Sequence, residues 1–73
     1  MPQERIESPL PGTIAGVSVG LGRKVEEGDE LCLLESMKME NPILAPVSGT
    51  VSKIEIEKGQ VVQAGALMMV IDY

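Results

Sequence analysis

Apolar residues fall in short runs along this chain, and the runs of the second half repeat those of the first. A shift of 37 positions places Ile6 on Ile43 and aligns residues 6–36 with residues 43–73 without a gap. Glycines, prolines and apolar positions keep their spacing in both copies. A repeat of this kind indicates one supersecondary unit used twice, so we expect a single domain over residues 1–73.

The apolar runs are short, rich in β-branched residues and bounded by glycine or proline, which is the pattern of β-strands. We therefore predict an all-β fold, a small sandwich or flattened barrel with pseudo-two-fold symmetry. The predicted strands cover residues 13–19, 24–25, 31–35, 50–57, 61–62 and 67–71, and residues 1–7 and 42–46 are predicted as lead-in segments. The glycines that recur in both halves are assigned to turns, and they are Gly12, Gly22, Gly28, Gly49, Gly59 and Gly65.

A helix over residues 31–40 is the alternative, because leucine, glutamate, methionine and lysine are good helix formers. Two observations count against it. Pro42 follows closely, and residues 68–71, which align with residues 31–34, have the composition of a strand.

Composition excludes several kinds of function. One cysteine and no histidine leave no internal disulfide and no zinc site, so we expect no bound metal. A net charge of −5 without a basic cluster argues against binding to nucleic acid or to an anionic membrane. The chain opens on no apolar run typical of a signal peptide, and Cys32 has the setting of a buried thiol in a reducing compartment. We expect a soluble monomer in the cytoplasm.

Lys38 lies between two methionines where the two copies of the repeat join, in the run Glu35-Ser36-Met37-Lys38-Met39-Glu40. Ser36 aligns with Tyr73, so the residues after Ser36 have no counterpart in the second copy. If the copies are related by a two-fold axis, Lys38 lies at one tip of the molecule and both termini lie at the other. Met37-Lys38 lacks the Asn-Gly pattern of a tight hairpin turn, so the local rule is broken or the loop is wider. An extended run would place both methionines on the face opposite Lys38.

The run at residues 35–40, with Gly28-Asp29-Glu30-Leu31 and Pro9-Leu10-Pro11-Gly12-Thr13 before it, resembles the biotinyl domains of biotin-dependent carboxylases and decarboxylases. The resemblance covers about residues 6–72 and implies two four-stranded antiparallel sheets. It implies that Lys38 carries covalent biotin and that Glu35, Ser36 and Glu40 flank the motif. Methionine often fills a core, but beside a lysine at a hairpin tip we expect Met37 and Met39 to form an apolar surface that partner proteins recognise. Ser36 replaces the alanine more common in the family. The short connection at residues 20–23 is similar to that of members without a protruding thumb.

The resemblance implies a carrier that catalyses nothing itself. Biotin on Lys38 would move carboxylate as a swinging arm between a biotin carboxylase and a carboxyltransferase, after attachment by a biotin protein ligase. In a eukaryotic carboxylase the location would be the mitochondrial matrix. One alternative is a lipoyl carrier, whose motif resembles Asp-Lys-Ala rather than Met-Lys-Met. Another is an unmodified barrel that acts as an adaptor, for which Lys38 would be dispensable.

Overall fold

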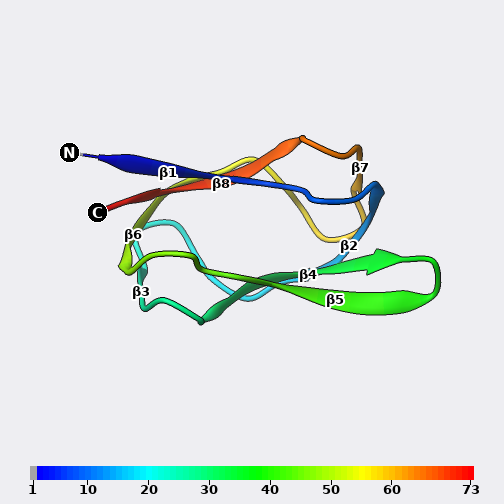
Figure 1. Ribbon diagram of the computed structural model, residues 1–73, viewed down its shortest axis with the longest axis horizontal. Coiled ribbons are helices and arrows are strands. Elements are labelled where there is room, and N and C mark those ends of the chain that lie inside the picture. The colour runs from blue at the N-terminus through cyan, green and yellow to red at the C-terminus, as the bar shows by residue number, and fades with distance from the viewer. Residues whose placement is uncertain (1) are drawn as a thin grey trace.

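The computed structural model describes residues 2–73, and these residues form eight β-strands and no helix. Figure 1 shows an elongated molecule, with principal extents of 35 × 18 × 17 Å. No helix among the described residues could cross a membrane. In chain order the strands are β1 (Gln3–Glu7), β2 (Gly12–Val17), β3 (Lys24–Val25), β4 (Glu30–Ser36), β5 (Met39–Leu44), β6 (Gly49–Ile54), β7 (Val61–Val62) and β8 (Leu67–Asp72).

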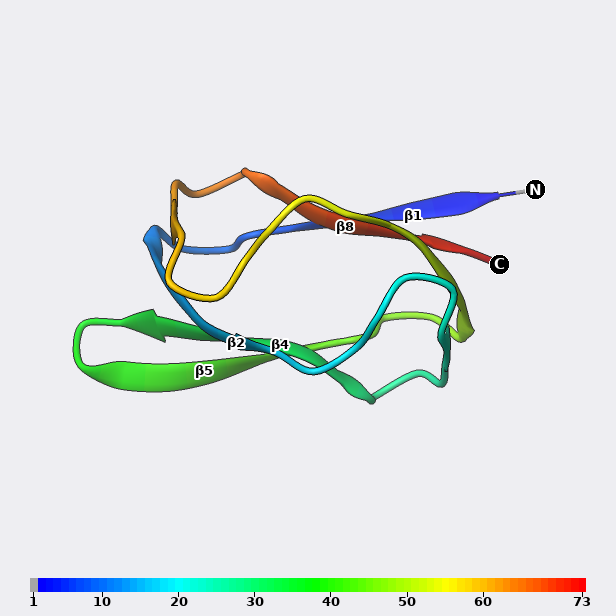
Figure 2. The ribbon, with the colours of Figure 1, turned by 180° about the vertical axis from the view of Figure 1, so that it is seen from behind.

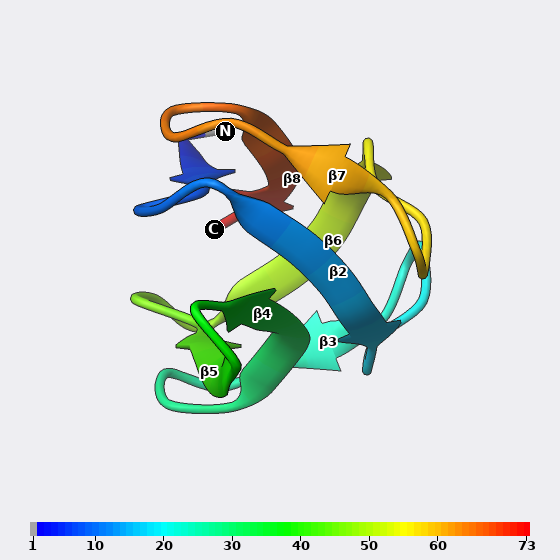
Figure 3. The same cartoon turned by 90° about the vertical axis from the view of Figure 1, so that its right-hand side faces the viewer.

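The strands form two four-stranded antiparallel sheets related by a pseudo-two-fold axis. One sheet has the order β1-β8-β6-β3 and the other has the order β5-β4-β2-β7. The 37-residue shift converts the first order into the second, strand for strand. In the end-on view of Figure 3, β2 and β6 run diagonally between the two layers, which gives a flattened barrel. The predicted fold class is confirmed.

Irregularities of the ladders also repeat. The β2–β4 pair shifts register between Ile14 and Gly16, and the β6–β8 pair shifts between Val51 and Lys53, which are the equivalent positions. Each shift is a β-bulge, which bends a strand and increases its twist. The bends occur in the two strands that pass from one layer to the other, so they help the sheets to curve around one core.

The core is aliphatic, and one inner strand of each sheet, β4 and β8, supplies about half of its buried residues. In β4 the side chains of Leu31, Cys32 and Leu34 are fully buried, and β8 contributes Met68 and its neighbours in the same way. Each of these two strands has a hydrogen-bonded neighbour on both edges, and its residues form a near-continuous apolar run.

The repeated glycines perform two different tasks. Four of them have positive φ in turns, as predicted: Gly22, Gly28, Gly59 and Gly65. Gly12 and Gly49 were assigned to turns, and that assignment is wrong, because each begins a strand. A Cβ on Gly12 would lie 2.5 Å from the carbonyl oxygen of Glu35, so this glycine is required by the close approach of two backbones.

Residues 1–7 and 42–46 were predicted as lead-in segments, and this is wrong for most of them, since they form edge strands β1 and β5. Polar residues and Pro42 hid these strands, because an edge strand tolerates both. Strand β6 ends at Ile54, before the predicted end at residue 57. The helix alternative for residues 31–40 is excluded, because these residues form β4, a turn and the start of β5.

Candidate functional site

The junction of the two repeats is a β-hairpin that ends in a two-residue turn. Strand β4 pairs with β5 in the register Ser36 with Met39 and Glu35 with Glu40, which leaves only Met37 and Lys38 between the strands. Figures 1 and 2 show this turn at one end of the long axis and both chain termini at the opposite end. The predicted placement of Lys38 at the tip far from the termini is confirmed.

Both turn residues have a left-handed backbone. The φ angles are 54° at Met37 and 65° at Lys38, and no other non-glycine residue among those described has positive φ. Positive φ at both central positions is the pattern of a type I′ turn, which normally selects Asn-Gly. The turn is therefore tight rather than wide, and it breaks the local rule. The run is not extended at this point, so the condition for placing both methionines opposite Lys38 is not met, because Met37 and Lys38 make the turn.

The side chains at the tip are open to solvent. Met37 is 92% exposed and Met39 is 66% exposed, although methionine is usually a core residue. Lys38 is also exposed, and it takes part in neither of the ion pairs recorded among residues 2–73, which join Arg5 to Glu7 and Lys53 to Glu55. The amine is therefore presented without a carboxylate from its own chain holding it.

Two side chains form hydrogen bonds to backbone carbonyl oxygens at the base of the hairpin. The Ser36 hydroxyl donates a hydrogen bond of 2.9 Å to the carbonyl oxygen of Pro11, in the loop that precedes β2. The Asn41 amide donates to the carbonyl oxygens of Leu34 and Met39 at 3.4 and 3.3 Å. The sequence motif included Ser36 but missed Asn41, whose position directly after the run was its only signal. Together these bonds fix the direction in which the tip points.

Comparison with known proteins decides the family. The family model described as "Biotin-requiring enzyme" matches residues 4–71, which is nearly the whole chain. This chain belongs to that family. The fold, the exposed lysine and the flanking methionines agree with the resemblance drawn from the motif, and the prediction of a biotinyl carrier domain is confirmed.

Relatives of this biotinyl domain include free-standing carriers and large enzymes. It is 52% identical over 58 residues to a biotin carboxyl carrier protein of Streptococcus mutans, and the match covers 80% of this chain and 45% of that one. It is 46% identical over 68 residues to the biotinylated protein TB7.3 homolog of Mycobacterium leprae, covering 93% of this chain and 96% of that one. The crystal structure of urea carboxylase from Kluyveromyces lactis matches with a TM-score of 0.91 and 35% identity, over 99% of this chain and 6% of that one.

The names of these relatives favour biotin over lipoate as the attached group. The same names, a carrier protein, a biotinylated protein and a carboxylase, do not favour the alternative of an unmodified adaptor. The biotinyl domain spans less than half of the streptococcal carrier and a small fraction of the carboxylase.

The motif acids lie beside the tip, directly opposite each other on β4 and β5. Glu35 and Glu40 are direct cross-strand neighbours, and both are exposed. Like charges that face each other across a ladder are mildly destabilising. Asp72, the repeat counterpart of Glu35, is instead satisfied by hydrogen bonds from the side chains of Gln3 and Ser52, each 3.0 Å long. The pair of facing carboxylates at the hairpin end thus has no equivalent at the aligned position of the second repeat.

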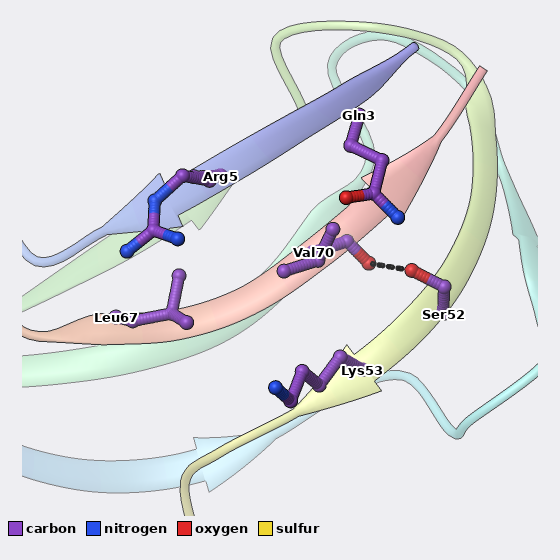
Figure 4. Close-up of a pocket in the computed structure, with 6 residues that line it drawn as sticks. All are labelled: Gln3, Arg5, Ser52, Lys53, Leu67 and Val70. Carbon is purple, nitrogen blue, oxygen red and sulfur yellow. Dashed lines mark hydrogen bonds between the residues drawn. The ribbon is translucent and has the colours of Figure 1, made fainter. Parts of the chain in front are cut away.

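An open hollow of about 410 Å³ lies on the other sheet of the biotinyl domain, along β1, β6 and β8 (Figure 4). Figure 4 shows Arg5 and Lys53 on either side of an apolar floor, with the Ser52 hydroxyl bonded to the Val70 carbonyl oxygen. Both cations are already paired with carboxylates of their own strand segments, at 3.5 and 3.2 Å. The hollow therefore offers no free charge for a ligand, and the hairpin tip remains the site.

Proposed function

We propose that this chain acts as a single biotinyl domain, that Lys38 is its attachment residue, and that Met37 and Met39 are read by its partner proteins. The observation that carries the proposal is an exposed lysine without an ion partner, held on a two-residue turn between two exposed methionines. The fit to biotin is direct, because an amide on the Lys38 amine requires an accessible nitrogen and room beyond it.

In this proposal the chain supplies only the Lys38 amine for amide formation, and the ligase catalyses the reaction. A free lysine amine is almost entirely an ammonium near neutral pH, so the ligase must remove a proton from Lys38 before the amide forms. Amide formation removes the positive charge and takes the net charge from −5 to −6.

Once modified, the lysine stem acts as a flexible arm on a rigid support. Biotin would supply the atom that takes up and releases carboxylate, and the chain supplies its position. The β4–β5 hairpin holds the arm at the end of the molecule opposite the termini (Figure 1), so a longer polypeptide joined at either terminus would not cover it. A tethered arm reaches an effective concentration on the order of mM at each site that it visits.

The partners we propose are a biotin protein ligase, an ATP-dependent biotin carboxylase and a carboxyltransferase. The names of the relatives support carboxylases as a class, and they differ in the substrate that is carboxylated. We place the exchange in the cytoplasm, or in the mitochondrial matrix if the chain derives from a eukaryotic carboxylase.

Intact mass spectrometry after incubation with biotin, ATP and a biotin protein ligase tests the attachment residue. We expect one biotin per chain for the original sequence and none for Lys38→Arg. Lys58→Arg is the matched control, because Lys58 is also an exposed lysine in a turn but has no flanking methionine. Modification of the Lys38→Arg variant, or its loss in Lys58→Arg, would overturn the assignment.

A further inference from the structure

The four methionines among the described residues 2–73 fall into two sharply different environments. Met37 and Met39 are 92% and 66% exposed at the hairpin tip, whereas Met68 and Met69 are fully buried in β8. Exposure governs how fast a thioether meets an oxidant dissolved in water. Residues 2–73 therefore hold two accessible thioethers and two protected ones, and the accessible pair flanks Lys38.

We propose that Met37 and Met39 form a reversible oxidation site, where a hydroperoxide controls the recognition of Lys38 by partner proteins. In the chemical step the thioether sulfur attacks the terminal oxygen of the hydroperoxide, and the O–O bond breaks. The sulfur gains one S=O bond and is oxidised by two electrons, and the peroxide is reduced. With hydrogen peroxide, the departing hydroxide takes the proton of the transferred oxygen and leaves as water. Methionine sulfoxide reductases reverse this step at exposed sulfoxides, with a thiol as reductant.

The consequence follows from where these side chains lie. A sulfoxide is polar and chiral, whereas the methionine thioether is flexible and apolar. An apolar pocket on a partner protein that accepts the thioether would therefore bind the sulfoxide more weakly. Neither Met37 nor Met39 supports the core, so the barrel keeps its stability while the tip changes. The inference rests on the proposed function, since it assumes that partners bind the tip in order to reach Lys38.

The other oxidisable side chain with a defined position is protected. Cys32 is fully buried between β2 and β5, and burial, with a smaller contribution from Glu30, raises the pKa of its thiol to about 11. The thiolate is the form that reacts with peroxides, so Cys32 reacts slowly while the chain is folded. The exposed Met37 and Met39 should therefore be oxidised before the buried sulfur atoms of Cys32, Met68 and Met69.

The first measurement locates the oxidation and does not depend on biotin. The unmodified chain is treated with hydrogen peroxide, digested with trypsin and mapped by mass spectrometry. Cleavage after Lys38 separates Met37 and Met39, which fall on peptides 25–38 and 39–53, while peptide 59–73 carries the two buried methionines. We expect the tip methionines to oxidise roughly tenfold faster or more, because buried sites must first open. Equal rates at all four methionines would overturn the proposal.

The second measurement tests the consequence, with the chain oxidised before any biotin is present because biotin itself contains a thioether. We expect the oxidised chain to be biotinylated roughly tenfold more slowly at limiting ligase, with an unchanged melting temperature. Treatment with methionine sulfoxide reductase should restore the rate. The Met37→Leu/Met39→Leu double variant is the control, since its rate, whatever its starting value, should be the same before and after peroxide.

The outcomes separate this inference from the proposed function. A reduced chain that the ligase leaves unmodified would contradict the proposed function and the oxidation site with it. A reduced chain that is biotinylated normally, and an oxidised chain that is biotinylated at the same rate, would contradict only the oxidation site.

Discussion

The strained turn at the hairpin tip gives a quantitative prediction. Met37 is held at a φ of 54°, in the left-handed region. That conformation costs about 1–2 kcal/mol for an ordinary L-residue and less for asparagine, whose short polar side chain tolerates it. Met37 is also 92% exposed, so replacing it removes almost no buried apolar surface. Met37→Asn should therefore raise the free energy of unfolding by about 1 kcal/mol.

The assay is thermal unfolding followed by circular dichroism, because the chain has no tryptophan to serve as a fluorescent probe. For a domain of this size 1 kcal/mol corresponds to a rise in melting temperature of about 4–8 °C. Met39→Asn is the matched control. Met39 is exposed too, but it begins β5 with no positive φ, and asparagine is disfavoured in strands, so no gain is expected there.

A melting temperature for Met37→Asn that is equal to or below the original would refute the idea that the turn is strained. A gain of the same size for Met39→Asn would show that polarity at the tip, rather than backbone conformation, is responsible. The same variant bears on recognition. It keeps the turn and Lys38 but loses an apolar side chain, so the ligase should modify this more stable protein more slowly.

Three further predictions concern the support of the site. Gly12→Ala should destabilise the fold by about 1–3 kcal/mol, because its methyl group would enter the backbone of β4, whereas Gly16→Ala, which meets open space, should be nearly neutral in a urea titration. Ser36→Ala should cost about 0.5–1.5 kcal/mol in the same titration through its lost bond to Pro11, and an unchanged midpoint would show that the bond contributes nothing. In the folded protein the pKa of the Cys32 thiol is raised from 9.0 to about 11. The neutral thiol should therefore contribute fully to the free energy of unfolding below pH 9, and this contribution should be lost as the pH rises toward 11. Cys32→Ala should remove that part of the pH dependence of stability.

The duplicated fold could be predicted because the repeat constrains each half by the other. The two-residue strands β3 and β7 are too short to recognise singly, yet each supports the assignment of its partner at the equivalent position. The central strand β8 likewise favoured a strand over a helix for residues 31–36, where composition alone was ambiguous. Agreement between two copies replaced the homologous sequences that such assignments usually need.

The edge strands and the turn could not be predicted from local signals. Strand β1 has a single buried apolar residue, Ile6, and β5 contains a proline, so neither sequence shows a regular alternation of apolar and polar residues. They are strands because a ladder with β8 or β4 is available on one side. The turn at Met37 opposes its own residue preferences, and it forms because the register of β4 and β5 leaves only two residues to connect them.

The absence of symmetry at the tip explains why the chemistry is found there. Every strand of one repeat has a counterpart whose residues must also fit the shared core, so a change in one copy is limited by its surroundings in both sheets. Among residues 2–73 the link between β4 and β5 has no counterpart, and its aligned position is Tyr73, whose backbone amide donates to the carbonyl oxygen of Pro2. The side chains on this link, Met37 and Lys38, are exposed and do not pack against the core. Residues placed there could change to suit a ligase or a carboxylase without loss of the fold, and a tether at the termini would leave the modified lysine at the far end of a 35 Å molecule.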